Sequence, residues 1–201
     1  MKTLLIIDVQ NDFMPNGSLP VPNGDEIVPV INKIRDQFDL VIGTQDWHPK
    51  DHISFASNHE EKSNFDVIEI HNQPQTLWPD HCVQGTEGAK FHPGLNTEKF
   101  EAIFRKGTDK TIDSYSAFYD NGHLKSTGLT GYLKEKEITQ LYVCGLAADI
   151  CVYFSIIDAL QEGFSCYFID DASKALDAKE FETLKKEMIA KGIQIVRSES
   201  L

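Results

Sequence analysis

Short apolar runs separated by helical patterns constrain the fold of this chain more than any other feature. Six runs have the length and composition of strands buried on both faces: Leu4–Ile7, Leu40–Ile42, Ala102–Phe104, Leu141–Cys144, Cys166–Ile169 and Ile193–Val196. Apolar residues at helical spacing lie between most of them: Ile27–Ile34, Leu129–Leu133, Asp149–Leu160 and Phe181–Ile189. Strands alternating with helices predict a three-layer α/β/α fold with a doubly wound, mostly parallel sheet of about six strands.

The length of the chain and its lack of linkers predict one domain. The chain has 201 residues, which is ordinary for a single domain, and we find no internal repeat or linker between residues 1 and 201. The stretch from about 47 to 99 breaks the rhythm, because it holds no clean helix and many His, Pro, Asn and Gly residues. Loop-rich inserts of this length inside a domain are usually functional, so we expect this one to carry site residues.

Charge and hydropathy exclude several classes of partner. The chain has 31 acidic residues against 19 Lys and Arg, a formal net charge of −12, which argues against a nucleic-acid binder. No apolar run is long enough to cross a membrane, and Leu4–Ile7 is too short for a secretory signal. We therefore expect a cytoplasmic protein with neither nucleic acid nor membrane as partner, whose four cysteines are reduced thiols.

Chemically active residues follow the predicted strands at the points where they end. Asp8 ends the first run, Asp46 the second and Lys106 the third, while the fourth leads through Gly145 into a helix that bears Cys151. Each residue alone is more often a cap, an ion-pair partner or a small core residue. Because ligands of open α/β sheets bind at the carboxyl ends of the strands, the four together predict a site.

Cys151 is the candidate nucleophile of this site. It falls in the first turn of its helix, where free N–H groups and a neighbouring lysine are expected to stabilise a thiolate. The same N–H groups can bind an oxyanion, and Asp8 can carry the thiol proton to a leaving amine. Cys144 and Cys166 lie in apolar runs and are expected in the core, and Cys82 has no helix start behind it.

A second candidate site is a metal centre. Asp46 and His48 stand two residues apart, and His81 lies in the loop-rich insert. Two histidines and one aspartate can hold zinc, iron or manganese and leave positions open for water or substrate. Spare candidate ligands are His52, Glu60 and Glu61, whereas surface or loop positions are expected for His59, His71, His92 and His123.

Taken together, these motifs resemble those of the nicotinamidases, a family within the isochorismatase-like cysteine hydrolase superfamily. The matching segments occur in the family's order: Ile7–Phe13, Asp46–Pro49, Trp78–Thr86, Arg105–Gly107, Tyr115–Phe118 and Gly145–Val152. An Asp, Lys and Cys triad is general to the superfamily. The D-W-H and W-P-D-H-C-V-Q-G segments are more specific, because many relatives lack the metal.

The resemblance implies a role for each matching residue. It implies a catalytic triad of Asp8, Lys106 and Cys151 and a metal site of Asp46, His48 and His81, completed by waters or a pyridine nitrogen. It also implies oxyanion donors at Ala147 and Cys151, a cis peptide between Leu146 and Ala147, and ring contacts from Phe13, Trp78 and Tyr115. Whether His52 is a further ligand stays open.

The activity that the resemblance implies is deamidation of nicotinamide to nicotinate and ammonia through a thioester, as in NAD salvage. One divalent metal ion, zinc before iron or manganese, would be the cofactor, and pyrazinamide a second substrate. An amidohydrolase acting on ureides or N-carbamoyl compounds would share the triad without needing Asp46, His48 and His81. A thiol- or metal-sensing binding module would use Cys151 and the histidines without turnover. The oligomeric state stays open.

Overall fold

A six-stranded parallel sheet forms the centre of the protein. A computed structural model describes the whole chain, residues 1–201. The strands of the sheet are β1 (Thr3–Ile7), β2 (Leu40–Asp46), β5 (Phe100–Lys106), β6 (Gln140–Gly145), β7 (Ser165–Ser173) and β8 (Gln194–Val196). Their order is β5-β2-β1-β6-β7-β8, and every neighbouring pair is parallel. The predicted α/β fold is confirmed, and each predicted run falls on a strand, apart from Ile193 just before β8.

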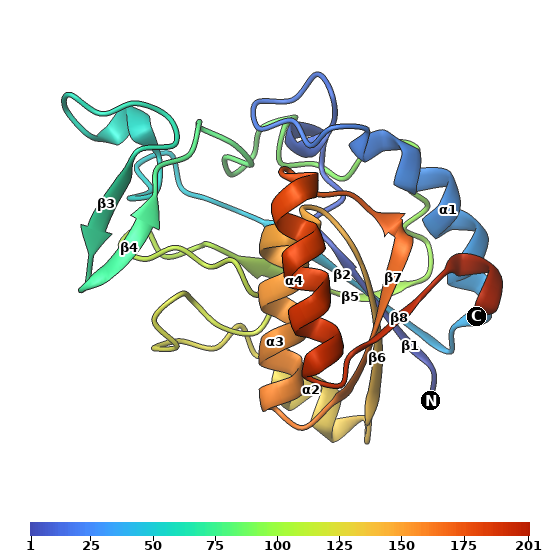
Figure 1. Cartoon of the computed structure of the whole chain (residues 1–201). Helices are drawn as coiled ribbons and strands as arrows, with labels where there is room; N and C mark the ends of the chain where they lie inside the picture. Colours follow the sequence, from blue (N-terminus) through green and yellow to red (C-terminus); the bar gives the residue numbers. More distant parts are fainter.

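Helices cover both faces of the sheet (Figure 1). They are α1 (Ile27–Ile34), α2 (Leu129–Glu135), α3 (Tyr153–Gln161) and α4 (Ala178–Ala190). Because side chains alternate along a strand, Leu4 and Ile6 of β1 pack in one core with α1, while Leu5 and Ile7 pack in the other with α2, α3 and α4. None of the helices has the length and apolar character that a membrane span requires.

Short turns complete the secondary structure. Single 3₁₀ turns occupy Asn11–Phe13, Gly24–Glu26, Arg35–Gln37, Ala56–Asn58 and Ser198–Ser200. A π-helical turn, Ala148–Val152, directly precedes α3. The predicted helix over Asp149–Leu160 is therefore two elements, and π turns of this kind often occur at functional sites.

The order of the strands places the site. From β1 the chain builds outward through β2 to β5, and it then returns to add β6 on the opposite side of β1. The connections after β1 and β6 therefore leave in opposite directions and open a crevice between them. Ile7 pairs with Gly145 at this edge, so the segments that begin at Asp8 and Leu146 start side by side.

The stretch between β2 and β5 has no α-helix, as expected. It does include a β-hairpin that is not predicted from the sequence. Its strands are β3 (Val67–Ile70) and β4 (Gln73–Thr76), which pair antiparallel and project from the body of the protein (Figure 1). The two turn residues, His71 and Asn72, both have positive φ, at 52° and 59°. Positive φ at both turn residues is typical of a two-residue hairpin loop. Histidine in the first position is not typical of such a loop, so the sequence does not predict the turn.

Substitution of Gly145 tests whether the fold depends on the close approach of β6 to β1. Its φ is +123°, and a Cβ at this position would lie 2.0 Å from the carbonyl oxygen of Ile7. We expect Gly145→Ala to lower the free energy of unfolding in urea by about 2 kcal/mol or more. Gly131→Ala is the matched control, because Gly131 lies in α2 with open space around it, and this change should stabilise by roughly 0.5–1 kcal/mol. Equal effects of the two substitutions would contradict the expectation.

Candidate active site

The ammonium group of Lys106 joins the predicted catalytic residues. Lys106 is the last residue of β5, and its Nζ lies 2.9 Å from Asp8 Oδ2 and donates to Asp46 Oδ1 at 2.5 Å. The same Nζ lies 3.1 Å from the carbonyl oxygen of Ser114 and 3.4 Å from Cys151 Sγ. Burial lowers the pKa of Lys106, but the carboxylates of Asp46 and Asp8 outweigh burial and hold that pKa well above its ordinary value. Lys106 is therefore a permanent buried cation.

One carboxylate oxygen of Asp8 faces the ammonium group of Lys106 near the thiol. Asp8 directly follows β1 and has a positive φ of 48°, an uncommon conformation for a residue other than glycine. Thr44 donates from Oγ1 to Asp8 Oδ1 at 2.6 Å, whereas Oδ2 pairs with Lys106 and meets no other donor. Carboxylate oxygens of Asp8 and Asp46 and the Sγ of Cys151 lie within 4.8 Å of one another. Burial raises the pKa of Asp8, Lys106 lowers it and Asp46 raises it again; the net pKa is above the ordinary value, which suits a base.

Cys151 lies in the π-helical turn before α3 and lines a pocket whose lining residues are mostly hydrophobic. The expectation that its pKa is lowered is wrong. Burial raises the pKa of the Cys151 thiol well above its ordinary value, more than Lys106 lowers it, and the charges of Asp46 and Asp8 also raise it. Attack by this thiol therefore needs a base that takes its proton. The sequence predicts a lysine near the Cys151 thiol, but it does not show how deeply that thiol is buried.

The other three cysteines are buried free thiols. Burial raises the pKa of Cys82, Cys144 and Cys166, and none of them lines the pocket. The core positions expected for Cys144 and Cys166 are confirmed.

The two residues predicted to bind an oxyanion share the pocket with the thiol. Ala147 and Cys151 both line it, and the peptide between Leu146 and Ala147 is cis, as the resemblance implies. The N–H of Ala147 donates no hydrogen bond within the chain. This donor is thus free for a ligand oxygen, and the oxyanion role stays a prediction.

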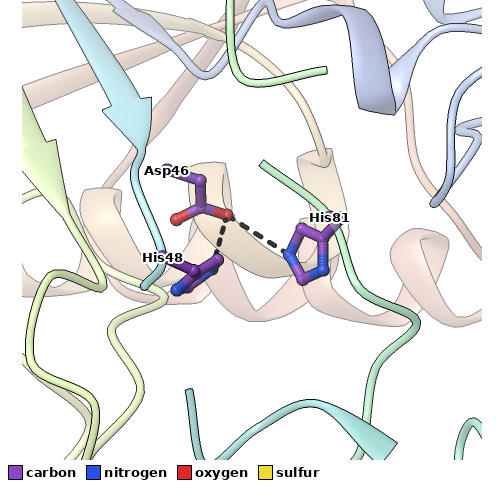
Figure 2. Close-up of side chains that lie close together, drawn as sticks. All are labelled: Asp46, His48 and His81. Carbon is purple, nitrogen blue, oxygen red and sulfur yellow. Dashed lines mark ion pairs between the residues drawn. The ribbon is translucent and has the colours of Figure 1, made fainter. Parts of the chain in front are cut away.

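The three predicted metal ligands meet at one carboxylate oxygen. Asp46 Oδ2 lies 3.6 Å from His48 Nε2 and 3.7 Å from His81 Nε2, as Figure 2 shows. The Nδ1 of His48 lies 3.0 Å from the carbonyl oxygen of Gly107, and that of His81 lies 2.7 Å from the carbonyl oxygen of Pro79. A ring that donates from Nδ1 to a carbonyl keeps an Nε2 lone pair for a metal.

The geometry of this cluster fits a four-coordinate metal ion. Ligand atoms with zinc bonds of roughly 2.0–2.1 Å lie about 3.3 Å apart in a tetrahedron, close to the observed separations. Burial raises the pKa of Asp46, but Lys106 and His48 outweigh it and hold that pKa well below its ordinary value. The donor set is therefore one ionised carboxylate and two imidazoles, all buried.

Of the remaining histidines and acidic residues considered as metal ligands, only His52 lies close to the metal cluster. His52 is buried, its ring centroid lies 4.3 Å from that of His48, and its Nε2 has no hydrogen-bond partner. Together with Asp113 these two histidines form a second group of possible ligand atoms. Burial lowers the pKa of His52 to about 4, which keeps its ring neutral. Residues outside both groups are Glu60, Glu61, His59, His71, His92 and His123.

The pocket has a mostly apolar lining, since eight of its 12 lining residues are hydrophobic. The predicted ring contacts Phe13, Trp78 and Tyr115 all line it, and the rings of Trp78 and Tyr115 meet edge to face with centroids 6.1 Å apart. Four further lining residues are absent from the predicted site: Leu19, Asp113, Ile150 and Leu176. Ile150 lies in the Gly145–Val152 motif next to Cys151, whereas the other three come from separate segments outside the motifs, so only the fold brings them to the pocket.

Two polar side chains of the Ile7–Phe13 segment hold the site from behind. Gln10 Nε2 donates to the carbonyl oxygen of Asp46 at 2.8 Å, and Gln10 Oε1 accepts from the N–H of Asp46 at 2.8 Å. Asp12 Oδ2 accepts from the N–H of Cys82 at 2.7 Å and so fixes the loop that bears His81. From the sequence, only Asp8 and Phe13 of this motif are assigned to the site. Gln10 and Asp12 could have been assigned as well, because they are polar residues within the same motif.

Comparison with known proteins identifies the family. Residues 2–200 match the isochorismatase domain, and the chain belongs to the isochorismatase family. It is 47% identical to a nicotinamidase of Acinetobacter baylyi, over 98% of this chain and 93% of that protein.

Solved structures agree with this assignment. A nicotinamidase and pyrazinamidase of Acinetobacter baumanii superposes with a TM-score of 0.96 at 46% identity, covering 99% of this chain and 97% of the other. A pyrazinamidase of Pyrococcus horikoshii in complex with zinc gives a TM-score of 0.80 at 35% identity, covering 98% of each chain.

Zinc binding tests the metal cluster directly. We expect the wild type to retain about one zinc ion per chain after dialysis and His81→Ala to retain almost none, measured by elemental analysis, because three protein ligands are the usual minimum. His92→Ala is the matched control, since His92 lies outside both ligand groups. Equal zinc content in His81→Ala and the wild type would contradict the assignment.

Proposed function

We propose that this chain hydrolyses nicotinamide to nicotinate and ammonia, and that it deamidates pyrazinamide by the same route. The observation that carries the proposal is that the Cys151 thiol and the Asp46, His48 and His81 cluster line one small aromatic pocket. The identity of nearly half over almost the whole length to a nicotinamidase supports it. The product, nicotinate, would enter NAD salvage, and we place the reaction in the cytoplasm.

The pocket suits a single heteroaromatic ring that carries an amide. Phe13, Trp78 and Tyr115 provide apolar walls for the ring faces and edges. A divalent ion, zinc in our proposal and iron or manganese as alternatives, would be held by Asp46, His48 and His81 and would act as a Lewis acid toward the ring nitrogen. The walls then orient the amide carbon toward Cys151, which makes the attack effectively intramolecular.

Proton transfer falls to Asp8. Its Oδ2 accepts the thiol proton as Sγ bonds to the amide carbon, while the N–H groups of Ala147 and Cys151 bind the oxygen that becomes negative. Asp8 returns the proton to nitrogen as the C–N bond breaks, so ammonia leaves and a thioester remains. A water molecule then attacks the thioester carbon as Asp8 takes one of its protons. The C–S bond breaks, Asp8 returns that proton to Sγ, and the free thiol and nicotinic acid result; the acid then ionises to nicotinate. Lys106 holds Asp8 in place and balances its charge.

The metal cluster separates this proposal from its alternatives. An amidohydrolase for ureides or N-carbamoyl compounds would need Asp8, Lys106 and Cys151 but not the cluster, so its presence favours a substrate with a ring nitrogen. A thiol- or metal-sensing module would release no ammonia from any of these compounds. Ammonia release measured across nicotinamide, pyrazinamide, a ureide and an N-carbamoyl amino acid distinguishes the three.

Cys151→Ala tests the covalent route. We expect ammonia release from nicotinamide to fall by at least about 10⁴-fold, since no other thiol lines the pocket, while nicotinamide binding stays within a few-fold by calorimetry. Cys166→Ala is the control, because this thiol lies buried in β7 outside the pocket. Retained turnover in purified Cys151→Ala would overturn the scheme.

Thr44→Val tests Asp8 as the base through pH dependence. The Thr44 hydrogen bond stabilises the ionised form of Asp8 and lowers its pKa, so its removal raises that pKa. Since the base must be unprotonated, activity falls as pH drops through this pKa. The acidic limb of kcat/KM should therefore move to higher pH by about one unit or more.

Thr3→Val is the control for this experiment, because the Thr3 hydroxyl is also buried in the sheet but has no partner. Its acidic limb should coincide with that of the wild type. An unmoved limb in Thr44→Val, or one moved to lower pH, would rule out Asp8 as the titrating base.

A further inference from the structure

We propose that Gln75 is a positioning residue that fixes Tyr115 and Asp113 on the wall of the pocket and thereby sets the affinity for the substrate ring. The proposal deepens the proposed function and rests on it. Gln75 belongs to β4 of the projecting hairpin and does not itself line the pocket. It touches no reacting atom, so its influence passes through the two residues that it holds.

The hairpin that carries Gln75 has almost no core of its own. Of the residues from Val67 to Thr76, Gln75 alone is buried, with 5% of its surface exposed, whereas Val67 is 64% exposed. An isolated two-stranded hairpin is marginal in water. A hairpin whose one buried side chain is a polar amide is placed by hydrogen bonds rather than by packing.

The amide of Gln75 makes these hydrogen bonds to residues of the pocket. Its Nε2 lies 3.0 Å from Asp113 Oδ2, 3.1 Å from the hydroxyl of Tyr115 and 2.8 Å from the carbonyl oxygen of Thr76. The orientation of the amide follows from chemistry, because a carboxylate oxygen and a carbonyl oxygen accept and only the NH₂ end can donate to them.

A neighbouring asparagine supports the same arrangement. Asn121 Oδ1 accepts from the N–H of Tyr115 at 2.9 Å, and the N–H of Asn121 donates to the carbonyl oxygen of Asp113 at 2.8 Å. Asn121 therefore holds the backbone at Asp113 and Tyr115, and its Nδ2 also donates to Gln75 Oε1 at 3.5 Å. What Gln75 adds is a contact to the side chains of these two pocket-lining residues.

The same strand also leads to the adjoining residue of the aromatic wall, Trp78. Trp78 follows the end of β4 by two residues, and its ring meets that of Tyr115 edge to face. Gln75 thus ties the strand that delivers Trp78 to the hydroxyl of Tyr115. Loss of the amide would leave Asp113 Oδ2 without its donor and would remove one of the polar contacts of the Tyr115 hydroxyl.

Gln75→Leu tests the proposal, with Gln73→Leu as the matched control. Gln73 lies on the same side of β4 two residues earlier, but it is exposed and its side chain makes no hydrogen bond. We expect Gln75→Leu to raise KM for nicotinamide about tenfold and to change kcat by less than about twofold, because the wall binds the ring but does not take part in bond breaking. Gln73→Leu should match the wild type in both constants.

A double-substitution cycle with Tyr115→Phe shows whether Gln75 acts through Tyr115. Tyr115→Phe removes the hydroxyl that Gln75 contacts, so the effect of Gln75→Leu on KM should be smaller in that background than in the wild type. Fully additive effects would overturn the proposed route. Should Gln75→Leu fail to fold, Gln75→Met, which keeps an unbranched chain without a donor, takes its place.

The outcomes separate the two proposals. A wild type that releases no ammonia from nicotinamide overturns the proposed function. An active wild type with an unchanged KM in folded Gln75→Leu overturns the role of Gln75 alone. If kcat and KM are impaired to the same extent and thermal stability is lower, the role of Gln75 is merely structural, and this outcome would also overturn the proposal.

Discussion

The site depends on one buried cation and the two carboxylates that surround it. Lys106 ends β5, Asp46 ends β2 and Asp8 follows β1, three neighbouring strands of the sheet, so the strand order itself brings the charges together. Desolvation of three charges is costly, and they are tolerated because one oxygen of each carboxylate faces the ammonium group. Removal of Lys106 would leave two buried carboxylates without a counter-charge, which couples the chemistry of the site to the stability of the sheet.

Asp46 links the two halves of the site. One of its oxygens accepts from Lys106 and the other faces His48 and His81, while Gln10 holds its backbone from behind. The thiol half shows the opposite compromise. Burial beside two carboxylates excludes water from Cys151 but keeps its proton in place, and the raised pKa of Asp8 makes that residue a better acceptor for it. Burial therefore weakens the resting nucleophile and strengthens its base.

Much of this arrangement follows from the sequence, because both strands and strand ends are local patterns. The six apolar runs predict the sheet, and the rule that parallel strands end at one edge brings Asp8, Asp46, Lys106 and Cys151 together. Contacts between distant segments do not follow. Thr44 and Gln10 look like ordinary buried polar residues of their segments, the hairpin lacks a typical turn, and Gln75 gains its partners only once the hairpin has folded beside Tyr115. The direction of the Cys151 pKa shift was missed for the same reason, since burial is a property of the whole fold.

The hairpin of β3 and β4 lies outside the six-stranded sheet that holds the reacting groups. One of the three aromatic wall residues, Trp78, follows this hairpin by two residues, and a second, Tyr115, contacts it through Gln75. The base and the buried cation, by contrast, lie at strand ends, and the nucleophile lies in the turn that follows β6. A change in the length or composition of this hairpin would therefore alter the wall of the pocket while the ends of β1, β2 and β5 kept the reacting groups in place.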